Sequence, residues 1–106
     1  MSRYKNITST AENTAGLSRR ACSILLQLYY HTDDDNLVSK AKLIRNTGLE
    51  MDQRTWNKYW KELEEKNVLH RVKSKLWMLS PHHCFADVRK HANMIKLWDE
   101  LCTTNH

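Results

Sequence analysis

The stretch from Asp52 to Lys66 carries side chains whose types suit hydrogen bonding to nucleic-acid bases. Trp56, Trp60 and Leu63 recur there at i, i+4 and i+7, which places them on one face of an α-helix. The polar side chains fall outside this apolar stripe; they are Gln53, Arg54, Asn57, Lys58 and Lys61. A helix with one aromatic face and an opposite face of such polar side chains suits a groove of DNA. We call the polar face the front of the helix. An ordinary core helix with a solvated polar face fits the same pattern equally well.

The two ends of this stretch carry residues that start and stop helices. Asp52 can accept hydrogen bonds from the free backbone N–H groups of a first helical turn, so it is a candidate N-cap. Asn67 tolerates the left-handed conformation in which many helices end. The sequence therefore predicts one helix from Asp52 to Lys66.

The charge of the chain is concentrated around this helix. Residues 36–79 hold ten basic and five acidic residues, so they account for the whole net charge of +5. Both flanks of that segment are neutral. A basic segment between neutral flanks is typical of a phosphate-binding surface, although basic surfaces also serve solubility alone.

Composition limits the class of protein. A chain of 106 residues predicts one small domain, and two glycines with one proline leave little scope for a β-barrel or a glycine-rich phosphate loop. We find no run of about 18 apolar residues and no apolar leader at the N-terminus. Three cysteines without a CxxC pair favour free thiols in a reducing compartment. A cytoplasmic protein is therefore expected, and a nucleoid-associated one if its basic segment binds DNA.

The chain before the central stretch predicts an arm, two helices and a short strand. Residues 1–16 are polar and without periodicity, which predicts a flexible arm. Ser18 can cap a helix that reaches about Tyr30, and a polar turn follows. Leu37-Val38 fits a short strand, and Ser39 can cap a helix over Lys40 to Asn46, with Ala41, Leu43 and Ile44 facing inward. Gly48 is expected to supply a positive φ in a short turn, with Leu49 filling the space between the helices.

The chain after the central stretch predicts a hairpin and a last helix. Residues 68–73 and 76–79 fit two strands, and because Ser74-Lys75 lacks glycine the loop is expected to be wider than two residues. Ser80-Pro81 ends the second strand. The last helix is expected from about Ala86 to Cys102. Its broad apolar face can pack on its own domain or form a homodimer; the apolar residues are Val88, Met94, Ile95, Trp98 and Leu101.

The order helix, strand, helix, turn, helix and hairpin over residues 17–80 resembles a winged helix-turn-helix domain. The similar runs are Leu43-Ile44, Thr47-Gly48-Leu49, Arg54-Thr55-Trp56 and residues 63–69. Many bacterial members of that superfamily carry a glycine where Asn67 stands. The resemblance implies an α+β, mostly α fold: a three-helix core with a short β-hairpin wing, followed by an additional C-terminal helix within residues 81–106.

The end of the hairpin resembles a narrower group. Leu76-Trp77-Met78-Leu79-Ser80-Pro81, with a later helix that contains Lys96-Leu97-Trp98, is similar to the RepL-type replication initiators of small plasmids. Ser80 stands where those proteins have asparagine. The resemblance implies a plasmid- or phage-type replication initiator, and a transcriptional regulator fits the same residues.

A winged helix-turn-helix would assign each basic residue a role on double-stranded DNA. The start of the third helix would enter the major groove, and its base-edge candidates are Gln53, Arg54, Thr55, Asn57 and Lys58. Phosphates would be bound by Lys61 of the same helix and by Lys40, Lys42 and Arg45. The wing residues Arg71, Lys73 and Lys75 would hold the adjacent backbone or minor groove. We expect Trp56 and Trp60 in the core rather than stacked on bases.

Other chemistries fit the sequence less well. His82, His83 and Cys84 lack the regular spacing of a zinc site, and no serine lies in a nucleophile motif. We therefore expect no metal, no cofactor and no enzymatic activity. The main alternative is a winged-helix docking module whose basic face binds an acidic protein. An RNA-binding role has no aromatic strand motif to support it.

Overall fold

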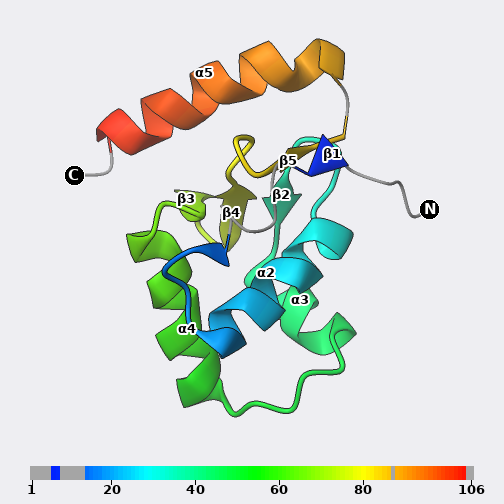
Figure 1. Ribbon diagram of the computed structural model, residues 1–106, viewed down its shortest axis with the longest axis vertical. Helices are drawn as coiled ribbons and strands as arrows, with labels where there is room; N and C mark the ends of the chain where they lie inside the picture. The colour runs from blue at the N-terminus through cyan, green and yellow to red at the C-terminus, as the bar shows by residue number, and fades with distance from the viewer. Residues whose placement is uncertain (1–5, 8–13, 87, 105–106) are drawn as a thin grey trace.

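The computed structural model describes residues 6–7, 14–86 and 88–104 of the chain. These residues form an α+β fold in which helices predominate and a three-stranded antiparallel sheet lies between them (Figure 1). The predicted α+β, mostly helical class is therefore confirmed. In chain order the elements are β1 (Asn6–Ile7), α2 (Arg19–His31), β2 (Leu37–Val38), α3 (Lys40–Asn46), α4 (Gln53–Glu65), β3 (Leu69–Lys73), β4 (Leu76–Leu79), β5 (Cys84–Phe85) and α5 (Val88–Thr104).

The three helices before the hairpin begin at the predicted caps. Ser18 Oγ accepts from the N–H of Ala21, Ser39 Oγ accepts from the N–H of Lys42, and Asp52 Oδ1 accepts from the N–H of Thr55. Each bond satisfies a backbone donor that a first helical turn leaves without an intrahelical partner. Asn67 follows α4 with a φ of 59°, so the predicted left-handed stop is also confirmed.

The connection from α3 to α4 differs from the prediction. Gly48 does not adopt a positive φ; among the described glycines only Gly16 does. Thr47 ends α3 in an extended conformation with φ −90° and ψ 156°, so the chain leaves the helix without the reversal that needs glycine. Residues 47–52 then lead to α4, a longer link than the short turn expected. Leu49 packs against the core as predicted, whereas Ala41 is exposed rather than inward-facing.

The sheet is built from a hairpin and the short strand before α3. Its strand order is β2-β4-β3, and all neighbours are antiparallel. Lys73 pairs with Leu76, so the hairpin loop has two residues and the expectation of a wider loop is wrong. The tight loop forms because Lys75 adopts a φ of 65°, a conformation that glycine or asparagine usually supplies. The register shifts between Arg71 and Lys73, and Arg71 faces Trp77.

The sheet separates two apolar clusters. Helices α2 and α4 lie on one side of the sheet, and α5 lies across the other (Figure 1). Neighbouring β4 residues point to opposite sides, as the alternation of strand side chains requires: Leu79 joins the α2–α4 cluster, and Met78 joins Met94 and Trp98 of α5. The larger cluster includes Ile24, Leu25, Leu28, Trp56, Trp60, Leu63 and Leu69. The predicted core role of Trp56 and Trp60 is therefore confirmed.

The segment predicted to be a flexible arm contains a short strand. Asn6 and Ile7 form β1, which pairs antiparallel with Phe85 and Cys84 of β5. Pairing with a segment so distant in the chain supplies hydrogen bonds that the local sequence does not reveal, and the flexibility of the arm stays a prediction. Residues 1–5 and 8–13 of this segment lie outside the described residues.

Candidate nucleic-acid interface

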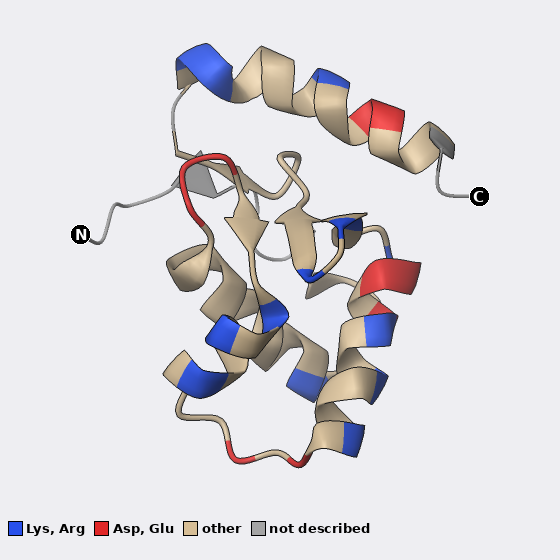
Figure 2. Cartoon of the chain, turned by 180° about the vertical axis from the view of Figure 1, so that it is seen from behind, with Lys and Arg blue, Asp and Glu red and all other residues tan. Residues whose placement is uncertain are grey.

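The polar front of α4 lies on the surface as predicted. Gln53, Arg54, Asn57, Lys58 and Lys61 are exposed, and only Thr55 of the base-edge candidates is half-buried. Lysines and arginines also lie on α3 and on the β3–β4 hairpin (Figure 2). There Lys42, Arg45, Arg71, Lys73 and Lys75 are exposed, and Lys40 is half-buried. The helix pair and the hairpin therefore present basic side chains to solvent.

Lys40 connects α3 to α4 through Asn57. The Lys40 ammonium donates to Asn57 Oδ1 at 2.6 Å, and Gln53 Nε2 donates to the same oxygen at 3.1 Å. Burial lowers the pKa of Lys40, and the Glu64 carboxylate partly opposes that shift. Three residues from two helices thus form one hydrogen-bonded group at the surface.

Two tryptophans connect this group to the hairpin. Trp60 of α4 and Trp77 of β4 meet edge to face, with ring centroids 5.4 Å apart and an interplanar angle of 89°. The Lys40 ammonium lies 5.4 Å from the Trp60 centroid, and the Arg71 guanidinium lies 5.7 Å from the Trp77 centroid. Both distances fall within the range of cation–π attraction. The two contacting tryptophan rings therefore hold Lys40 of α3 and Arg71 of β3 in place, one cation on each ring.

The acidic residues of α4 are concentrated in its C-terminal half. Glu62 accepts from the Ser18 backbone N–H at 2.7 Å and from Ser18 Oγ at 2.9 Å, so its charge lies at the N-terminus of α2. Glu64 acts on Lys40 and His70, and Glu65 is exposed. Like-charge repulsion would keep a polyanion from this end of the helix. The first two turns of α4 are therefore the part suited to an anionic ligand.

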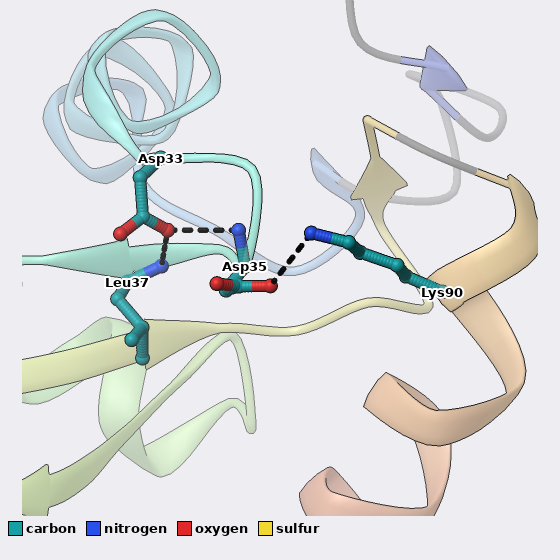
Figure 3. Close-up of polar contacts among 4 residues, drawn as sticks. All are labelled: Asp33, Asp35, Leu37 and Lys90. Carbon is teal, nitrogen blue, oxygen red and sulfur yellow. Dashed lines mark hydrogen bonds and ion pairs between the residues drawn. The ribbon is translucent and has the colours of Figure 1, made fainter.

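Two further carboxylates help to shape the loop that precedes β2. Asp33 Oδ1 accepts from the backbone N–H groups of Asp35 at 2.8 Å and Leu37 at 2.9 Å, and Asp35 forms an ion pair with Lys90 at 3.7 Å (Figure 3). Both partners of that ion pair are more than half exposed, so the pair contributes little stability. The predicted polar turn is thus an ordered turn that contacts the start of α5.

The described histidines and cysteines lie at several separate places in the fold. Within the described residues, no group of three His, Cys, Asp or Glu side chains could hold a metal ion. Cys84 is buried in β5, and His82 is exposed. His91 stacks on Phe85, and Cys102 Sγ lies 3.3 Å from His70 Nε2.

Sequence reasoning located the surface residues of α4 but missed the contacts between elements. No local signal relates Lys40 to Asn57, because the two are 17 positions apart and meet only through helix packing. The position of Trp77 under Arg71 also depends on the shifted register of the hairpin. The first contact links two helices that the sequence had placed separately, and the second depends on the register within the predicted hairpin.

No protein-family model, curated protein or solved structure matches the chain significantly, so a function has to be inferred from the residues themselves. None of the helices in the described part of the chain combines the length and the apolar run that crossing a bilayer requires.

Proposed function

We propose that the chain is a winged helix-turn-helix protein that binds double-stranded DNA in a sequence-specific way. The order α2, β2, α3, α4 and a β3–β4 hairpin supports this class, as does the sheet order β2-β4-β3. In such a domain the third helix of the core lies in the major groove and the hairpin serves as the wing. Here these elements are α4 and β3–β4.

The observation that carries the proposal is the chain of contacts from the front of α4 to the hairpin. Asn57 accepts a hydrogen bond from Lys40, whose ammonium lies over the Trp60 ring. Trp60 contacts Trp77 edge to face, and the Arg71 guanidinium lies over the Trp77 ring. Base-reading side chains and cations from three elements are therefore parts of one connected surface. A duplex needs this combination, because phosphate contacts position a protein and base contacts specify the sequence.

Lys75 provides a second line of support. It is an exposed lysine in the left-handed region, where glycine or asparagine would form the same turn at lower cost. Unfavourable backbone conformations are concentrated at functional sites. A cation at the tip of a wing has such a use, because it can reach a phosphate or the minor groove.

In the proposed complex, the two groups of side chains have separate roles. Gln53, Arg54, Thr55, Asn57 and Lys58 face base edges in the major groove. Lys42, Arg45 and Lys61 lie along the flanking backbone, and Arg71, Lys73 and Lys75 approach the adjacent phosphates or minor groove. Lys40, the remaining lysine of α3, is held by Asn57 and Trp60. A plasmid- or phage-type replication initiator or a transcriptional regulator, acting in the cytoplasm on nucleoid or plasmid DNA, would use such a domain.

A homodimer through α5 would have to use the outer surface of that helix. Met94 and Trp98 are already buried against the chain's own sheet, whereas Val88 is 71% exposed and Leu97 is 43% exposed. The two residues are nine positions apart and therefore lie on opposite flanks of the helix, so we propose Leu97 alone as the contact. Sedimentation of the parent and of a Leu97→Glu variant tests it: a dimer in the parent that the variant loses supports the contact, and a monomeric parent refutes it.

Binding to a random-sequence DNA duplex at several salt concentrations tests the main proposal. The variant is Arg54→Ala/Lys58→Ala, and the matched control is Arg89→Ala/Lys96→Ala, which removes the same charge from α5. We expect the parent affinity to fall steeply with salt, because counterions are released from the phosphates. The α4 variant should bind at least about tenfold more weakly than the control, because it removes two cations from the proposed interface and the control removes two from a helix outside it.

Two outcomes would overturn the proposal. Equal, small losses in both variants would mean that only the net charge matters. Parent binding without a steep salt dependence would exclude a duplex as the ligand and would favour the docking alternative, in which the same basic surface binds an acidic protein.

A further inference from the structure

The side-chain amide of Asn57 has a fixed orientation in the free protein. A lysine ammonium has donors only, so the atom of Asn57 that lies 2.6 Å from Lys40 Nζ has to be the oxygen. The reverse orientation would place an amide N–H₂ against an ammonium. Gln53 Nε2 donates to the same oxygen at 3.1 Å. Because a carbonyl oxygen has two lone pairs, these two donors fill the acceptor capacity of Asn57.

The Lys40 ammonium is held in this position by more than one contact. It lies over the Trp60 ring, 5.4 Å from the centroid, and the carboxylate of Glu64 acts on it electrostatically. Lys40 is half-buried, whereas Lys42 on the same helix is exposed. Moving Lys40 to a DNA phosphate would give up the contacts with Trp60 and Asn57 together. Lys40 is therefore better suited to orient Asn57 than to bind phosphate.

We propose that Asn57 acts on DNA as a hydrogen-bond donor only and selects guanine, with Lys40 as the positioning residue that imposes this choice. The inference rests on the proposed function and names the base that one of its residues reads.

The preference follows from the groove edges of the two purines. Pairing of asparagine with adenine uses both halves of the amide, since the oxygen accepts from N6 and the N–H₂ donates to N7. The oxygen of Asn57 is already occupied, so adenine would leave its N6 donor facing a filled acceptor. Guanine presents two acceptors, O6 and N7, to which the N–H₂ can donate.

Gln53 offers an internal contrast. Within the described residues no hydrogen bond to Gln53 Oε1 is formed, so the amide of Gln53 retains an acceptor. Gln53 can therefore still pair with adenine in the usual bidentate way. Two amides one helical turn apart would then read different bases.

Selection from a random duplex library tests the inference. The variants are Asn57→Ala, which identifies the position that Asn57 reads, and Lys40→Met, which keeps an apolar stem over Trp60 but frees one of the two acceptor positions of the amide oxygen. Lys42→Met is the matched control, because it removes the same charge from α3 without touching Asn57. Thermal unfolding of each variant confirms that it is folded.

We expect the parent to select guanine at the position that becomes degenerate in Asn57→Ala. In Lys40→Met, adenine should rise relative to guanine there by about tenfold, the discrimination that a good base contact supplies. Lys42→Met should bind more weakly but keep guanine. Adenine in the parent, or the same base preference in Lys40→Met and Lys42→Met, would overturn the inference and leave the proposed function intact. A library in which no sequence is enriched would overturn both.

Discussion

Asn36 and Leu79 are joined by two hydrogen bonds that run in opposite directions. The Leu79 backbone N–H donates to the Asn36 carbonyl oxygen at 2.8 Å, and Asn36 Nδ2 donates to the Leu79 carbonyl oxygen at 3.1 Å. The same Nδ2 also donates to the Cys84 carbonyl oxygen at 2.9 Å. Asn36 is fully buried and has a φ of 62°. One side chain thus ties the loop before β2 to the ends of β4 and β5.

Replacing Asn36 should destabilise the fold strongly. Asn36→Ala leaves two buried carbonyls without this donor and places alanine in the left-handed region, so we expect a loss of about 3 kcal/mol. Asn36→Gly removes the amide but accepts the φ, so its loss should be about 1 kcal/mol smaller. Urea unfolding measures both, with Asn46→Ala at the exposed end of α3 as the control. Equal losses in the alanine and glycine variants would show that the backbone conformation costs nothing here.

Lys75→Gly should stabilise the fold while it weakens the binding of a DNA duplex. Glycine adopts the observed φ of 65° without strain, so we expect the free energy of unfolding to rise by about 1 kcal/mol. The same change removes one cation from the wing, so the slope of log affinity for a duplex against log salt should become shallower by about 1. Lys66→Gly, at the end of α4, is the control, because Lys66 has no positive φ whose strain glycine would relieve. A variant that gains stability and binds a duplex with the parent's salt slope would remove Lys75 from the proposed interface.

Glu62 should stabilise the contact between α4 and the start of α2 through its charge. Glu62→Gln keeps a side chain of the same shape beside Ser18 but loses the negative charge at a helix N-terminus, so we expect about 1 kcal/mol of destabilisation. The loss should shrink at high salt. Glu65→Gln, which removes an exposed charge from the same helix, is the control for chemical denaturation of both variants. Equal effects of the two changes would mean that the Ser18 contact adds nothing.

The stability of the fold should fall in mildly acidic solution. Burial lowers the pKa of His70 and of His83 below the ordinary value, and the neighbouring His82 lowers the pKa of His83 further. The unfolded chain therefore binds more protons than the folded chain just below pH about 6.5. Stability should start to fall near that pH and level off below the folded pKa values.

Urea midpoints between pH 7.5 and 5.5 measure this effect, in a range above the titration of ordinary carboxyl groups. A His70→Gln/His83→Gln variant should lose most of the pH slope, and His31→Gln, at an exposed position, should keep it. A parent whose midpoint does not change over this range would contradict the prediction.

The local features of the fold could be read from the sequence because they depend on residues a few positions apart. Ser18, Ser39 and Asp52 cap helices by bonds that reach three residues along the chain. The spacing of Trp56, Trp60 and Leu63 fixed which face of α4 is buried, and with it the exposed front of the candidate site.

Other features depended on contacts that the local sequence does not encode. Gly48 was expected to reverse the chain, but Thr47 leads α3 into an extended link whose path follows the packing of Leu49 against the core. A regular two-residue hairpin that pairs Lys73 with Leu76 would place Arg71 opposite Met78. The shifted register places it opposite Trp77 instead, on the side of the sheet that faces α4.

The sequence by itself therefore determined the helices, their caps and the polar character of the α4 front. Only the tertiary structure decided how that front is organised, because the Lys40–Asn57 bond and the Trp60–Trp77 contact join different elements. Caps and periodicity arise from covalent neighbours, whose separation is nearly constant in a helix. The orientation of the Asn57 amide arises from the packing of α3 on α4, and a distance between two packed elements exists only once the chain has folded.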